Sequence, residues 1–211
     1  MWGLNEPRGQ KKRARPTLPL IVLFISFWSA AVMAEGFPSA GEAPPISEAP
    51  AGGDFQLDSS RGSVALKDFR DQVVLLYFGY TKCPDVCPTS LSVMTQVLNG
   101  LDEAELARVQ GLFVSVDPER DTFAVLDEYA DYFHEKITGI TGSPEAVAQV
   151  AAQYGARYYQ VELEGSSFGY AVNHSSVIYL ISRQGVLRFI FPHATPSPVI
   201  LEAVRYLLAN E

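Results

Sequence analysis

The segment Val73–Pro88, VVLLYFGYTKCPDVCP, determines the fold class that we expect for this chain. Its first half, Val73–Tyr80, is a continuous apolar run rich in β-branched and aromatic residues, which predicts a strand covered on both faces. Cys83 and Cys87 follow at once, and Thr89–Leu98 then shows apolar residues at helical spacing. A pair of cysteines is therefore expected at the junction of a buried strand and a helix.

The residues around this segment predict further strands and helices. We expect a hairpin of Phe55–Leu57 and Val64–Leu66, strands at Val109–Val116, Tyr158–Leu163, Val177–Ile181 and Val186–Phe191, and helices at Thr122–Phe133, from Ser143 through Tyr154, and at Ser197–Leu208. Parallel buried strands come first and an antiparallel hairpin comes near the end, which predicts a mixed sheet flanked by helices. With its cysteine pair after the first buried strand, this α/β pattern resembles the thioredoxin arrangement.

The sequence before this domain is of two kinds. Residues 1–15 carry five basic side chains against one acidic side chain, and Leu18–Ala34 is uncharged and mostly apolar. We expect residues 1–34 to be a signal peptide or an uncleaved membrane anchor, because such a run spans ~25 Å as a helix and the hydrocarbon core is ~30 Å thick. Residues 35–53 are rich in Pro, Gly, Ala and Glu and predict a flexible linker, so the domain is residues 54–211.

The charge of the chain argues against a nucleic-acid partner. The net charge is −8, and the basic side chains of the first residues make the remainder more acidic still. Binding to nucleic acid needs a basic face that displaces counterions from the phosphates. We therefore expect no nucleic-acid partner.

The spacing of the cysteines indicates chemistry rather than a structural disulfide. Cys83 and Cys87 are the only two cysteines, and a bridge between them would close a tiny loop and stabilise little. Pro88 fits the first turn of a helix, which would place Cys87 at the N-cap and Cys83 in the preceding loop. Free N–H groups at a helix start favour thiolate, which suits both metal binding and disulfide exchange.

A third ligand would have to be a histidine, and the chain has three. His134 lies in a charged stretch at the end of a predicted helix and His193 lies in a proline-rich turn, so we interpret both as surface or structural residues. His174 directly precedes the strand Val177–Ile181, where thioredoxins carry a cis-proline, and no proline occurs in Tyr170–Leu180. Two thiolates and an imidazole suit copper as Cu(I) or Cu(II).

Three motifs together resemble those of the Sco/SenC family. They are Phe78–Pro88 (FGYTKCPDVCP), Asp117–Thr122 (DPERDT), and His174-Ser175 followed by Tyr179-Leu180. The resemblance extends over about Asp54–Asn210. It implies a thioredoxin-like domain whose copper ligands are Cys83, Cys87 and His174, with Asp117 in a supporting or structural role because a carboxylate is a poor partner for Cu(I).

The family resemblance also implies a function, a partner and a location. Members deliver copper to the binuclear copper centre of cytochrome c oxidase, or reduce the cysteines of that centre. For this chain it implies a copper chaperone rather than an enzyme, exported to the periplasmic side of the inner membrane. Its partner would be the copper-bearing subunit of cytochrome c oxidase or another copper protein.

Two other functions remain open at this point. A thiol–disulfide oxidoreductase would use Cys83 and Cys87 as a redox pair, with His174 tuning their reactivity. A peroxidase-like protein would share the fold and a nucleophilic cysteine. One departure from the family bears on the predicted copper binding. Many relatives have Asp before the ligand histidine, whereas this chain has Asn173. We expect the loss of that charge to alter copper affinity, because partners of a metal ligand tune the metal.

Overall fold

The computed structural model describes residues 50–165 and 169–211. The predicted signal or anchor (residues 1–34) and nearly all of the predicted linker lie outside the described residues. Within the described ranges, no helix is both long and apolar enough to cross a membrane.

The domain alternates strands and helices in the order that the sequence predicted, with additions. The elements are β1 (Gln56–Ser59), β2 (Gly62–Ala65), the 3₁₀ turn η1 (Leu66–Phe69), β3 (Val73–Gly79), α1 (Val86–Asn99), α2 (Glu103–Leu106), β4 (Val109–Ser115), α3 (Phe123–Phe133), β5 (Ile137–Ile140), α4 (Pro144–Gln153), β6 (Tyr158–Glu162), β7 (Tyr170–His174), β8 (Ile178–Ile181), β9 (Leu187–Phe191) and α5 (Ser197–Asn210).

A five-stranded mixed sheet in the order β5-β4-β3-β8-β9 forms the centre of the domain. β3, β4 and β5 are parallel, whereas β8 runs antiparallel to β3 and β9 antiparallel to β8. Every residue of β3 is buried, as its continuous apolar run predicted. The carboxyl ends of the parallel strands meet at one edge of the sheet, so the residues that follow them lie close together.

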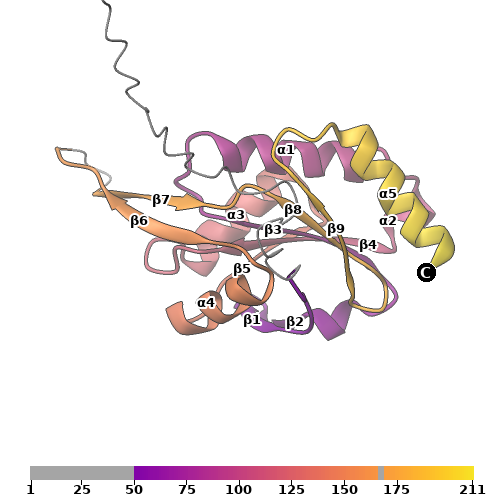
Figure 1. Cartoon of the computed structure of the whole chain (residues 1–211), viewed down its shortest axis with the longest axis horizontal. Helices are drawn as coiled ribbons and strands as arrows, with labels where there is room; N and C mark the ends of the chain where they lie inside the picture. The colour runs from indigo at the N-terminus through magenta and orange to yellow at the C-terminus, as the bar shows by residue number, and fades with distance from the viewer. Residues whose placement is uncertain (1–49, 166–168) are drawn as a thin grey trace, which may run out of the picture. The chain divides into compact units, whose positions relative to one another are not determined.

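The helices cover both faces of the sheet. α1 and α5 lie side by side over one face, and α4 lies on the opposite side together with the hairpin of β1 and β2 (Figure 1). α3 packs against α1 and β5. Ser143 caps α4 through its side chain, with Pro144 at the first helical position, as the sequence indicated. The fold is thus the predicted thioredoxin-like α/β arrangement of a mixed sheet with flanking helices.

Three details differ from the expectations. β6 is not part of the central sheet but pairs with β7, which the sequence did not predict, as a separate ribbon that projects from the sheet (Figure 1). β5 was also missed, because it has only four residues and one of them is a glycine. Helix α1 begins at Val86 after the N-cap residue Asp85, so Cys87 lies inside the first turn and is not the N-cap.

Candidate metal centre

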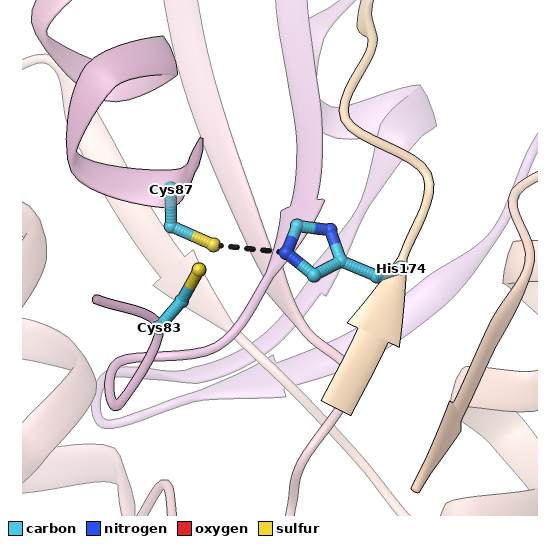
Figure 2. A group of neighbouring side chains, drawn as sticks. All are labelled: Cys83, Cys87 and His174. Atoms are coloured by element: carbon cyan, nitrogen blue, oxygen red, sulfur yellow. Dashed lines mark hydrogen bonds between the residues drawn. The ribbon is translucent and has the colours of Figure 1, made fainter. Parts of the chain in front are cut away.

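Two cysteines and one histidine converge at the end of β3. The ligand atoms of Cys83, Cys87 and His174 all lie within 4.8 Å of one another. Cys87 Sγ lies 3.2 Å from His174 Nε2, and Figure 2 shows both sulfur atoms directed toward the imidazole. The structure therefore brings together all three residues that the sequence singled out as candidate ligands, although 87 positions separate Cys87 from His174.

The two cysteines are placed by a short loop between a strand and a helix. β3 ends at Gly79, and the Cys83 N–H donates to the Tyr80 carbonyl across the loop, at 3.2 Å. Cys87 is completely buried, whereas Cys83 retains 9% of its surface. Gly79 has no side chain and so leaves room for the sulfur of Cys87, because a Cβ at this position would lie 2.6 Å from Cys87 Sγ. A glycine inside a buried strand commonly marks such a close approach.

The two thiols differ in acidity. The pKa of Cys83 is lowered to about 3, chiefly because Cys87 donates a hydrogen bond to it; burial opposes the shift, and a hydrogen bond from His174 and main-chain N–H groups near the helix start support it. Burial raises the pKa of Cys87 well above its usual range, and the hydrogen bond to Cys83 adds to this effect. In the metal-free protein the site therefore holds one thiolate and one thiol, and a metal ion would displace the remaining proton.

The orientation of His174 leaves one ring nitrogen available for a metal. His174 is the last residue of β7, rather than part of a loop as the sequence predicted. Its Nδ1 lies 3.1 Å from the Ser175 carbonyl oxygen. Because that oxygen can only accept, Nδ1 is the donor in this contact, and Nε2 is the ring nitrogen that faces the sulfur atoms. The rings of Tyr77 and Tyr80 pack edge-on against the imidazole, with centroids 6.1 and 5.8 Å away.

Asn173 does not take part in this arrangement. Its side chain is exposed and its amide donates to the Tyr159 hydroxyl on the neighbouring strand β6, at 2.9 Å. Successive side chains of a strand point to opposite faces, so Asn173 points away from the ring of His174. Our expectation that this residue tunes the ligand histidine is wrong, because the Ser175 carbonyl is the partner of the ring.

The Asp117–Thr122 motif supports both the cysteine loop and strand β7, the strand that carries His174. The buried Asp121 carboxylate accepts from the Thr81 N–H at 3.0 Å and from the Thr81 hydroxyl at 2.6 Å, which holds the start of the cysteine loop. Asp117 accepts from the Tyr170 hydroxyl at 2.7 Å, at the opposite end of β7 from His174. Arg120 binds Asp117 and lies over the Tyr170 ring, with its guanidinium carbon 3.7 Å from the centroid.

Sequence reasoning recognised this motif but missed Asp121 and Tyr170. The detectable signal for Asp121 was its place in the loop that follows the second buried parallel strand, which ends at Ser115. The ends of parallel strands meet at one edge of a sheet, so a carboxylate there can reach the cysteine loop. Asp117 is structural with respect to the three ligand atoms, as the sequence indicated.

The other two histidines lie outside the cluster. His134 follows the end of α3, is half-buried, and accepts a hydrogen bond at Nδ1 from the Lys136 N–H at 2.9 Å. It is thus a structural residue rather than a solvated one. His193 is exposed, and its Nδ1 lies 3.4 Å from the Ser90 hydroxyl. Among the described residues, Cys83, Cys87 and His174 form the one group of three or more that could hold a metal ion.

The donor set defines the chemistry that the site can support. Two sulfurs and one imidazole nitrogen are soft and borderline ligands, which suit copper, whereas a structural zinc site normally takes four protein ligands. The centre lies at the strand–helix junction of a thioredoxin-like domain. Fold and site together define a thioredoxin-like protein with a three-ligand metal centre.

Comparison with known proteins identifies the family. The chain matches the SCO1/SenC family over residues 43–209, and it belongs to this family. It is 44% identical over 159 residues to the mitochondrial protein SCO2 homolog of Bos taurus. Two solved structures share the fold: apo Sco1 of Thermus thermophilus (38% identity, TM-score 0.68, 75% of this chain and 92% of that one), and Arabidopsis thaliana ScoI with copper bound (33% identity, TM-score 0.69, 76% and 99%).

The match to the bovine relative covers 74% of this chain and 59% of that protein. The chain thus spans less than two thirds of the length of the curated relatives that it matches most strongly. Its similarity to them is that of the thioredoxin-like domain and its site.

Proposed function

We propose that this protein is a copper chaperone that binds copper through Cys83, Cys87 and His174. The observation that carries the proposal is the convergence of two sulfurs and one imidazole nitrogen within 4.8 Å, in a family whose solved structures include copper-bound forms. Nε2 of His174, which faces the sulfur atoms, and the thiolate favoured by the low pKa of Cys83 are two donors suited to a soft metal ion.

Copper is the cargo of this protein rather than a catalytic cofactor. Cys87 is completely buried, whereas Cys83 and His174 are partly exposed, so the Cys83 side of the centre is a side at which a ligand of another protein can replace one of its own. A centre with three protein ligands leaves a position that an incoming donor can occupy. Transfer by stepwise exchange of ligands needs no change in the oxidation state of Cu(I).

We further propose the client and the location. The resemblance of the three sequence motifs supports the copper-bearing subunit of cytochrome c oxidase as the client. The basic and apolar residues 1–34 support export with a signal or anchor, followed by a linker (35–53) that tethers the domain (54–211) at the membrane surface on the periplasmic side.

Copper stoichiometry tests the proposed function. The full chain, reduced and loaded with Cu(I), is expected to retain one copper ion after removal of excess metal, whereas a Cys83→Ser, Cys87→Ser double variant retains none. His134→Ala and His193→Ala are matched controls and should bind like the parent. Undiminished copper in the double variant would refute the proposal.

A thiol–disulfide oxidoreductase is the second candidate. It is favoured by the low pKa of Cys83 and by the short distance between the two sulfurs, since a thiolate beside a thiol is the arrangement that exchanges disulfides. The two functions differ in their need for His174, because copper binding uses the imidazole and disulfide formation does not.

A further inference from the structure

We propose that the hollow between the cysteine loop and α3 is the docking site for the protein that exchanges copper with this chain. It has a volume of about 310 Å³, and its walls are formed by Thr81, Lys82, Val125, Glu128, Tyr129 and Tyr132. The inference rests on the proposed function, and it assigns the surface through which the centre meets its partner.

The hollow lies beside the more accessible of the two cysteines. Thr81 and Lys82 line it and immediately precede Cys83, which retains 9% of its surface while Cys87 retains none. A donor atom of a partner must approach the metal past this loop. A segment of the partner that occupied the hollow would therefore hold such a donor near Cys83 during ligand exchange.

The outer face of α3 is apolar where a solvated face is expected. Leu126 and Ala130 face the core, and they account for the buried stripe of this amphipathic helix. Val125, Tyr129 and Tyr132 form a second stripe at spacings of four and seven residues, toward the cysteine loop.

The exposure of its large apolar side chains marks this stripe as an interface. Tyr132 is 83% exposed, more than any other large hydrophobic residue in the described part of the chain, and Val125 is 37% exposed. Exposed tyrosines near the centre of a patch are typical of interfaces. The Tyr129 hydroxyl is buried and has no hydrogen-bond partner among the described residues, so this unsatisfied polar group lies beneath the wall of the hollow.

The charge around the stripe specifies the partner. α3 carries Asp127, Glu128 and Asp131 and no basic residue between Phe123 and Phe133. The apolar patch is acidic on its α3 side and has Lys82 on its loop side, which fits a partner face on which a protruding apolar side chain has Lys or Arg on the side that meets α3. Association of such faces is faster at low salt, because opposite charges steer the encounter.

Copper transfer between proteins tests the docking site. The full chain, loaded with Cu(I), is mixed with the purified copper-bearing domain of a cytochrome c oxidase subunit, metal-free and with reduced thiols, and the transfer rate is measured. Tyr132→Ala should slow transfer about tenfold, as the loss of an interface aromatic residue commonly does. Tyr206→Ala is the matched control, because Tyr206 on α5 is also exposed, at 55%.

Charge reversal provides a second variant. Glu128→Lys should slow transfer and flatten its salt dependence, whereas Glu202→Lys on α5, where the side chain is also exposed, should do neither. Extraction of copper by a small chelator should proceed at the parental rate in all four variants, since it needs no docking.

The outcomes separate the two proposals. Transfer at the parental rate in Tyr132→Ala and Glu128→Lys would overturn the docking site and leave the chaperone function standing. Slower chelator extraction in the same variants would also overturn it, because the changes would then act on the centre itself. A change of oligomeric state without a change in transfer would assign the hollow to a second copy of this chain and refute the proposal. No transfer by the parent chain would overturn both proposals.

Discussion

Gly79 is the residue whose replacement should separate the packing of the centre from its ligands. In Gly79→Ala, the new Cβ would lie 2.6 Å from Cys87 Sγ and 2.9 Å from Phe113 Cε2. Real Cβ atoms do not approach other atoms so closely, and the strand cannot yield because all residues of β3 are buried. The sulfur must therefore move away from the position at which it faces His174.

The expected effect has two parts. Overpacking of a core typically costs about 1–3 kcal/mol, and the midpoint of thermal unfolding should fall by roughly 2–4 °C for each kcal/mol in a domain of this size. Copper affinity should fall in addition, because displacement of Cys87 Sγ by a few tenths of an ångström weakens a ligand without removing it. We expect a loss of roughly tenfold or more, as for other changes that misplace metal ligands.

Denaturant unfolding and competition titration with a Cu(I) chelator measure the two parts. Gly142→Ala is the first control, because its Cβ would meet the flexible end of Leu57 at 3.0 Å and the Ala146 Cβ at 3.6 Å, and neither residue is a ligand. Leu126→Ala is the second, since a cavity in the core lowers stability and leaves the centre intact. Parental copper affinity in Gly79→Ala would refute the steric role of Gly79. A loss of copper affinity no greater than that of Leu126→Ala, at equal loss of stability, would refute it as well.

Three other predictions concern the ligands and their neighbours. His174→Ala should weaken Cu(I) binding strongly in competition titrations and still form the Cys83–Cys87 disulfide on oxidation; a variant with full copper affinity would favour the oxidoreductase. Asn173→Asp should leave both Cu(I) and Cu(II) affinities unchanged, because the side chain faces Tyr159; a selective gain for Cu(II) would show that residue 173 reaches the imidazole after all. In the reduced, metal-free chain, the rate of Cys83 alkylation by iodoacetamide should be nearly constant from pH 5 to pH 8, because a pKa of about 3 keeps Cys83 a thiolate throughout. A rate that rises about tenfold per pH unit, measured by mass spectrometry, would instead indicate an ordinary thiol.

The cysteine half of the site could be predicted because it is local. A continuous apolar run, a loop with two cysteines and a helical pattern follow one another within Val73–Leu98, and each is determined by residues close in sequence. The boundary was wrong by two residues at Cys87, because Val86 and Cys87 precede Pro88 in the same first turn. Proline is compatible with any position of that turn, so it does not fix where the helix begins.

The histidine half could not be predicted in the same way. His174 reaches Cys87 across 87 positions, and only the order of strands in the sheet brings them together. β7 was missed because the ribbon of β6 and β7 projects from the sheet, where tertiary contacts rather than a long apolar pattern define it. The polar residues of β6, Gln160 and Glu162, were the available sign that this strand lies outside the central sheet.

The ligand set of the bound metal is the central claim of this account, and X-ray absorption at the copper edge tests it most directly. The full chain loaded with one equivalent of Cu(I) is measured beside its His174→Ala variant at equal copper content. We predict two sulfur ligands and one imidazole nitrogen in the parent, and the loss of the imidazole scattering in the variant with both sulfurs retained. An unchanged imidazole signal in His174→Ala, or a parent spectrum with fewer than two sulfurs, would contradict the assignment of Cys83, Cys87 and His174 as the copper centre.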